Sequence, residues 1–251
     1  MADSLCAETI RIRGHTDDEI EAYLARPSEL TRRGGVVQIH HMPGFDRATK
    51  EMTRRLAELG YDAICPNLYS REAPGATPDE AATVVRAQGG VPDEQVVGDV
   101  AAAAAYLRSL DTSSGRVGVI GHCSGGRQAV LAACSLPLDA AVDCYGGYVT
   151  GEPPAGRRIT NLVDKLPDLD CGLLGLFGNE DTAPSPQHVD ELETLLRQHR
   201  KSYEFHHYDG AGHAFFAVDR PSYRVEAAND GWQRIADFFA RHLGAASRTT
   251  T

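Results

Sequence analysis

Residues 116–126 read RVGVIGHCSGG, and this stretch decides the fold. The apolar, β-branched run over 116–120 predicts a buried strand, and the glycines after it predict a tight turn into a helix. Gly121 and Gly125 with a nucleophile midway between them form the G-x-S-x-G elbow pattern, with Cys123 in the place of the serine. Such a turn lifts the sulfur above the sheet and faces it with N–H groups of the helix N-terminus, which favour a thiolate and an oxyanion alike.

Other sites also use glycine-rich turns between a strand and a helix. A phosphate-binding P-loop would need a lysine that GHCSGG lacks, and a dinucleotide-binding loop would lie in the first strand–helix unit rather than mid-chain. Cys123 as a buried structural thiol is the remaining alternative. Ser124 is one position off the centre of the motif, so we expect its backbone N–H, and not its hydroxyl, to act in the site.

Strands and helices alternate along most of the chain. Expected strands cover 36–40, 62–65, 116–120, 140–145, 172–177 and 202–208, and expected helices cover 49–59, 79–87, 93–108, the segment from the turn through Cys134, 186–199 and 222–243. Residues 21–24 are expected to form an antiparallel edge strand, and 66–91 and 146–170 to be loop-rich. This order predicts a mostly parallel sheet with helices on both faces, typical of the α/β-hydrolase fold. We expect a single domain over 1–251, with a disordered tail at about 247–251.

A base and an acid follow the nucleophile in the order that this fold requires. Asp181 comes just after the strand at 172–177, where Glu180 competes with it for the role of the acid; the alternative role for Asp181 is a cap of the helix that begins near Ser185. His213 lies on a glycine-rich loop after the last strand. The sequence therefore predicts a Cys123–His213–Asp181 triad.

The second oxyanion donor is expected in the loop after the strand at 36–40. That loop reads His40-His41-Met42-Pro43-Gly44, and Pro43 has no N–H to donate. Met42 and Ser124 are therefore the predicted oxyanion hole.

Composition and charge exclude several classes of partner. The net charge of −10 argues against nucleic acid and anionic membranes, and no run approaches the length of a membrane span. The six cysteines show no CxxC pair, and no signal-peptide pattern opens the sequence, so we expect free thiols in the cytoplasm. The pairs at 40–41 and 206–207 are adjacent histidines that would point to opposite faces of a strand, so no metal site is expected, and no cofactor.

The motifs resemble those of the dienelactone hydrolase (carboxymethylenebutenolidase) family. Cys123, Asp181 and His213 fall on the family's triad, residues 65–75 (CPNLYSREAPG) resemble its P-D-L-Y-x-R-x-A-P-G segment, and 143–147 (DCYGG) resemble its tyrosine–glycine strand end. The resemblance implies an α/β-hydrolase that opens enol-lactones through a cysteine nucleophile and a thioester. Beside that function we keep acyl transfer or cyclisation by the same triad, and non-catalytic binding on a hydrolase scaffold.

Departures from the family pattern concern the substrate. His41 occupies the slot of a glutamate that holds the resting cysteine as a thiol, so we expect His41, as neighbour of the nucleophile, to favour the thiolate instead. Ala217 stands where the family has a carboxylate-binding arginine, and Arg86 is the candidate for a second one. The substrate is expected to be a small molecule, and the protein a monomer or homodimer. The expected pocket residues are Phe45, Tyr69, Arg71, Arg86, Tyr145 and Tyr148.

Overall fold

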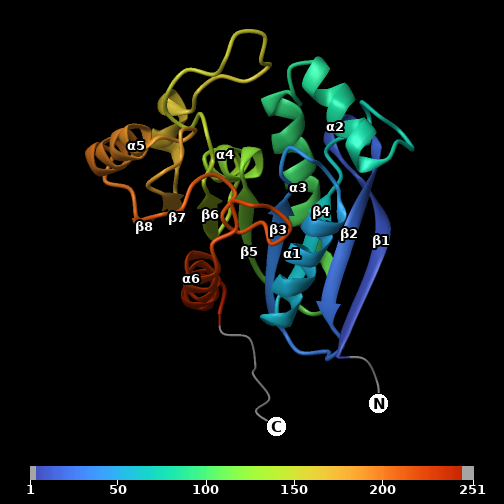
Figure 1. The fold of residues 1–251 in the computed structure, drawn as a ribbon. Coiled ribbons are helices and arrows are strands. Elements are labelled where there is room, and N and C mark those ends of the chain that lie inside the picture. Colours follow the sequence, from blue (N-terminus) through green and yellow to red (C-terminus); the bar gives the residue numbers. More distant parts are fainter. Residues whose placement is uncertain (1–3, 245–251) are drawn as a thin grey trace.

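The computed structural model describes residues 4–244, and its centre is an eight-stranded sheet of order β1-β2-β4-β3-β5-β6-β7-β8 (Figure 1). The strands are β1 Leu5–Arg13, β2 Glu19–Pro27, β3 Arg33–Ile39, β4 Asp62–Pro66, β5 Ser113–His122, β6 Ala140–Cys144, β7 Gly172–Gly178 and β8 Tyr203–Tyr208. Strand β2 is antiparallel to both β1 and β4. The strands β4, β3, β5, β6, β7 and β8, in this spatial order, pair in parallel. The predicted α/β-hydrolase fold, a mostly parallel sheet between helices, is confirmed.

Helices cover both faces of this sheet (Figure 1). They are α1 Arg47–Glu58, α2 Pro78–Ala87, α3 Asp93–Ser109, α4 Ser124–Ala133, α5 Pro186–Gln198 and α6 Val225–Leu243, with short 3₁₀ helices at His15–Asp17 and Val163–Asp168. Neighbouring residues of β3 point to opposite faces of the sheet. Val36 packs in the hydrophobic cluster that includes α1 and α6, and Val37 packs in the cluster that includes α3, α4 and α5. The parallel strands are therefore buried on both sides, as their apolar runs predict.

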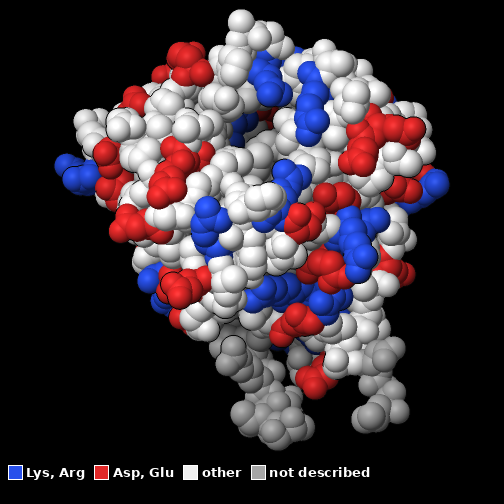
Figure 2. Space-filling view, in the orientation of Figure 1, with Lys and Arg blue, Asp and Glu red and all other residues white. Residues whose placement is uncertain are grey.

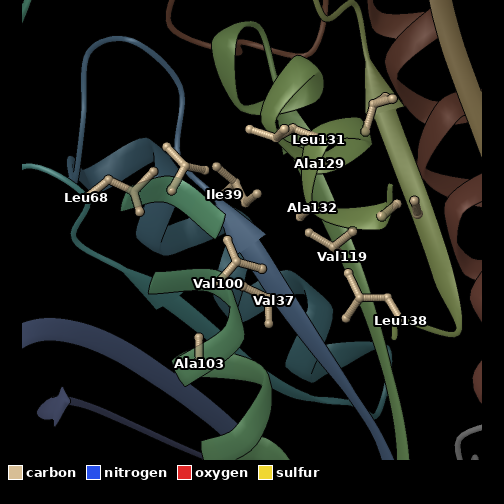
Figure 3. Close-up of a cluster of buried hydrophobic side chains, with 14 of the residues drawn as sticks. Val37, Ile39, Leu68, Val100, Ala103, Val119, Ala129, Leu131, Ala132 and Leu138 are labelled. Carbon is tan, nitrogen blue, oxygen red and sulfur yellow. The ribbon is translucent and has the colours of Figure 1, made fainter. Parts of the chain in front are cut away.

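Figure 3 shows the part of the core that supports helix α4. Val37 and Val119 from the sheet meet Val100 of α3 and Ala129 and Ala132 of α4, all of them fully buried (Figure 3). Small residues on α4 let the helix lie close to the sheet. This packing holds the N-terminus of α4 at the carboxyl end of β5, where the glycine-rich turn lies.

The N-terminal region differs from the sequence prediction. The antiparallel strand expected at 21–24 is part of the longer β2, and the sheet edge is formed by β1, which was not predicted. Strand β1 leaves most of its side chains exposed, and Ile12 is its one buried residue, so it lacks the apolar pattern of a half-buried strand. Residues 146–170 are loop-rich as expected, with one 3₁₀ helix. The tail predicted at 247–251 lies outside the described residues.

Within residues 4–244, no helix is both long and apolar enough to cross a membrane. In the same range, no group of three or more histidine, cysteine or acidic side chains is arranged to hold a metal ion. All six cysteines are free thiols.

Candidate active site

The turn between β5 and α4 holds Cys123 in a strained backbone conformation. Its φ is +56°, in the left-handed region that non-glycine residues rarely adopt. A Cβ at position 121 would lie 1.9 Å from the carbonyl oxygen of Gly125, and one at 125 would lie 2.6 Å from the carbonyl oxygen of Ile39. Both positions therefore require glycine, and the tight turn that they allow lifts the Cys123 side chain to the carboxyl edge of the sheet.

His213 and Asp181 come from the loops that follow β8 and β7. Nδ1 of His213 lies 2.8 Å from Oδ2 of Asp181, and the other carboxylate oxygen accepts a hydrogen bond of 2.9 Å from the N–H of Ala183. Asp181 is only 4 % exposed, so this carboxylate is held in place. Its bond to Nδ1 turns the opposite edge of the imidazole toward Cys123, whose side chain it hydrogen-bonds.

The electrostatics of Cys123 favour a thiolate. Burial by itself would raise the pKa of this thiol, but the hydrogen bond and charge of His213 and the backbone N–H groups of Ser124 and Met42 outweigh burial and lower it. Burial likewise works to lower the pKa of His213, yet its bonds to Asp181 and Cys123 raise it to about 10. The two groups stabilise each other as a thiolate and an imidazolium.

The two predicted oxyanion donors face the same sulfur atom, because both the N–H of Ser124 and the N–H of Met42 hydrogen-bond Cys123. Ser124 is the first residue of α4, where backbone N–H groups are free to bind an anion. Met42 lies in the turn after β3. The hydroxyl of Tyr69 donates a hydrogen bond of 3.0 Å to the Met42 carbonyl oxygen and so holds this turn in place.

A cavity of about 430 Å³ opens above Cys123. Its walls include the loop after α2 and the 146–170 segment, and Figure 2 shows a hollow in this part of the molecule with basic side chains around its rim. The lining residues are Met42, Tyr69, Val85, Gly89, Gly90, Val91, Cys123, Ser124, Arg127, Gln128, Gly147, Tyr148, Arg157, Ile159, Asp181, Thr182, Ala183 and His213. The volume suits a small molecule.

Two of the expected pocket residues lie elsewhere. Phe45 turns toward α1, where the ammonium of Lys50 lies 4.3 Å from its ring centroid, and it lines a separate hollow. Arg71 is held by two carboxylates, at 2.8 Å from Asp18 and 2.8 Å from Asp99. Asp99 is fully buried, so Arg71 neutralises it and is not available to a substrate. For these two residues the expectation was wrong.

The three expected tyrosines lie in or beside the cavity. Tyr69 and Tyr148 line it, and Tyr145 is buried behind His213 with its ring centroid 5.2 Å from that of the imidazole. Arg86 is outside the lining, although its positive charge, like that of Arg157, acts on the Tyr69 hydroxyl.

The side chain of His41 is paired with a carboxylate and not with Cys123. Its Nε2 lies 2.7 Å from Oδ2 of Asp46, the residue that caps the N-terminus of α1. Any positive charge on His41 is therefore balanced by that carboxylate. The groups that lower the pKa of Cys123 most are His213, Ser124 and Met42.

The sequence prediction missed residues on two walls of the cavity. Arg127 and Gln128 follow Ser124 by three and four positions on α4, so helical periodicity could have found them. Arg157 and Ile159 belong to the 146–170 loop, whose path no local sequence signal predicts.

Comparison with known proteins assigns the family. The sequence model of the dienelactone hydrolase family matches residues 20–243. The chain belongs to this family. A protein of Methylorubrum extorquens named "putative carboxymethylenebutenolidase" is 35% identical over 247 residues, which cover 98% of this chain and 84% of that protein. A "probable 2-oxo-3-(5-oxofuran-2-ylidene)propanoate lactonase" of Bradyrhizobium is 30% identical over 225 residues, covering 88% and 89% of the two chains.

Solved structures of dienelactone hydrolases agree with the fold. The crystal structure described as a "putative dienelactone hydrolase" from Klebsiella pneumoniae superposes with a TM-score of 0.85 at 31% identity, over 95% of this chain and all of that one (100%). The protein is thus a hydrolase of the dienelactone hydrolase family with an α/β-hydrolase fold.

Proposed function

We propose that this protein hydrolyses small esters or lactones, with Cys123 as nucleophile, His213 as general base and acid, and Asp181 as the residue that orients His213. The proposal is carried by the convergence of three groups on one sulfur atom: His213 and the N–H groups of Met42 and Ser124 all hydrogen-bond Cys123, at the base of a cavity. A merely structural thiol would have no use for an imidazole and two backbone donors.

The proposed reaction uses each of these groups in turn. The thiolate attacks the carbonyl carbon, and the N–H groups of Met42 and Ser124 receive the oxyanion, typically stabilising it by about 3 kcal/mol each. His213 then protonates the leaving oxygen, and the thioester forms. In the second half, His213 takes a proton from water, the hydroxide attacks the thioester, and the acid leaves while Cys123 returns to thiolate.

The resting thiolate is proposed to depend on His213, because His41 is paired with Asp46. Inactivation by iodoacetamide as a function of pH would test this. We expect the wild-type profile to titrate well below the ordinary thiol pKa of about 8.5, and a profile at that ordinary value would contradict the thiolate.

The substrate is proposed to carry a carboxylate. Arg157 lines the cavity together with Tyr69, and the positive charges of Arg86 and Arg157 both work to lower the pKa of Tyr69, against the burial that raises it. In a chain of net charge −10, two cations at one cavity favour an anionic ligand there. The free thiols suit a reducing compartment, and we propose that the enzyme works in the cytoplasm.

Turnover of p-nitrophenyl acetate and of a lactone panel by wild type, Cys123→Ala and Cys171→Ala tests the function. Cys171 precedes β7 at the opposite end of the sheet and serves as the matched control. We expect loss of turnover in Cys123→Ala alone, and an acetyl group on Cys123 by mass spectrometry of the wild type. Equal rates in wild type and Cys123→Ala would refute the proposal, and an added alcohol that diverts the product to a new ester would indicate acyl transfer.

A further inference from the structure

His40 is a buried histidine that no step of the proposed reaction uses. It follows the last residue of β3 and is 1 % exposed. Its Nε2 is 3.2 Å from the backbone N of Leu68, its Nδ1 is 2.9 Å from the carbonyl oxygen of His41, and its ring lies edge-on to Tyr69 at 4.6 Å. The imidazole thus bridges the loops that follow β3 and β4.

These partners determine which nitrogen of His40 carries the proton. The backbone N–H of Leu68 can only donate, so Nε2 must be the unprotonated acceptor. Nδ1 then carries the hydrogen and donates it to the carbonyl oxygen of His41. Burial lowers the pKa of His40 to about 4, outweighing the bond to His41, and the ring is neutral near pH 7, as this arrangement requires.

The carbonyl that His40 binds belongs to the same peptide group as the N–H of Met42. A peptide is planar, and its C=O and N–H point in opposite directions, so holding the oxygen of His41 sets the direction of the Met42 N–H. The N–H of Gly44 donates to the same oxygen over 2.8 Å. Two donors on one carbonyl also polarise the peptide and strengthen its N–H as a donor.

We propose that His40 is a positioning residue for the oxyanion hole: its Nδ1–H holds the His41–Met42 peptide so that the Met42 N–H faces the reacting carbonyl. The inference rests on the proposed function, since it concerns the oxyanion of that reaction. His40 itself touches neither the sulfur nor the substrate, because it is buried beneath the turn and outside the cavity lining.

Two substitutions separate the two hydrogen bonds of the ring. In His40→Asn, the side-chain amide can replace Nδ1–H as donor to the His41 carbonyl but is too short to reach Leu68. In His40→Gln, the side-chain oxygen can replace Nε2 as acceptor for Leu68, while the donor near His41 is lost. Both variants remove the ring, so a general loss of packing would affect them alike.

The test compares ester turnover with alkylation of Cys123 by iodoacetamide at a pH where the thiolate is fully formed. Alkylation passes through no oxyanion, so a defect in the oxyanion hole slows turnover alone. We expect His40→Gln to lower kcat at least tenfold with little change in KM. This decrease should be smaller than the 10²–10³-fold decrease in kcat that is typical when an oxyanion donor is deleted outright. We expect His40→Asn to stay within about threefold of wild type, and both to alkylate at the wild-type limiting rate.

A kcat for His40→Gln that equals or exceeds that of His40→Asn would overturn the role of His40, as would alkylation that falls in parallel with turnover. The variant His207→Gln, at an exposed position on β8, provides the control for replacing a histidine by glutamine. Cys123→Ala with wild-type turnover would refute the proposed function itself, whereas the His40 results alone leave that function standing.

Discussion

Asp143 is a carboxyl group whose burial should make the stability of the fold depend on pH. It lies in β6, is 0 % exposed, and accepts a hydrogen bond of 2.7 Å from the N–H of Gly146 through Oδ1. Its Oδ2 has no hydrogen-bond partner in the described structure. Burial raises the pKa of Asp143 to about 7, against the effects of the Gly146 bond and the charge of His213.

The sign and size of the effect follow from linkage. The unfolded chain releases the Asp143 proton near pH 3.8 and the folded chain only near about 7, so the contribution of Asp143 to stability is greatest at low pH and is lost as the pH rises from about 4 through about 7. Each pH unit between these values changes the free energy of unfolding by about 1.4 kcal/mol. Between pH 5 and pH 8.5, Asp143 should therefore cost the fold about 3 kcal/mol.

Asp143→Asn removes this titration and nearly preserves the shape of the side chain. Urea unfolding of wild type and variant at pH 5 and pH 8.5 gives the difference in unfolding free energy at each pH. We expect that difference to move by about 3 kcal/mol in favour of the variant between the two pH values. Asp190→Asn, an exposed substitution on α5, controls for the change of charge. A wild type–variant difference that is the same at both pH values would refute the reasoning.

Three further predictions concern the site. In Asp181→Asn the carboxylate that raises the pKa of His213 is lost, so kcat should fall roughly 10⁴-fold and the iodoacetamide profile should shift to higher pH; an unshifted profile would contradict the ion pair. Gly125→Ala would place a Cβ 2.6 Å from the Ile39 carbonyl oxygen, so it should lower stability by about 1–3 kcal/mol and abolish most turnover, measured by urea unfolding and ester hydrolysis. Arg157→Ala should raise KM about fivefold or more for esters that carry a carboxylate, an estimate based on the loss of one charge-assisted hydrogen bond. It should leave neutral esters unaffected, and its neighbour Arg158, outside the cavity lining, is the matched control.

Much of the site could be read from the sequence because its parts are local. The elbow is a turn whose glycines are required by backbone contacts within a few residues and by the neighbouring strand, and these contacts are repeated wherever the motif occurs. Asp181 and His213 each follow a strand end, and the carboxyl ends of parallel strands meet at one edge of a sheet. The positions of Cys123, Asp181 and His213 after strand ends therefore suffice to predict that the three residues lie together.

The mistaken residues show where local pattern fails. Phe45 and Arg71 lie in the expected segments, but the sequence does not show which partner each side chain contacts. The ring of Phe45 packs against the ammonium group of Lys50, and Arg71 forms an ion pair with the buried Asp99. Strand β1 escaped prediction because pairing with β2, and not burial of its side chains, holds it in the sheet. Arg71 is thus placed by a partner distant in sequence, β1 by pairing with the next strand, and Phe45 by a contact with the helix that follows it.

The sequence by itself determined the fold class, the family and the order along the chain of the proposed nucleophile, acid and base, because strand periodicity and tight turns depend on near neighbours. Only the tertiary structure decided the state of these groups. Folding brings His213 against Cys123 and turns His41 toward Asp46, so the pKa of the thiol is lowered by His213 and the backbone N–H groups of Ser124 and Met42, without the contribution expected from His41. Folding likewise decides the walls of the cavity, since Arg157 reaches it on a loop whose path depends on packing against the rest of the chain.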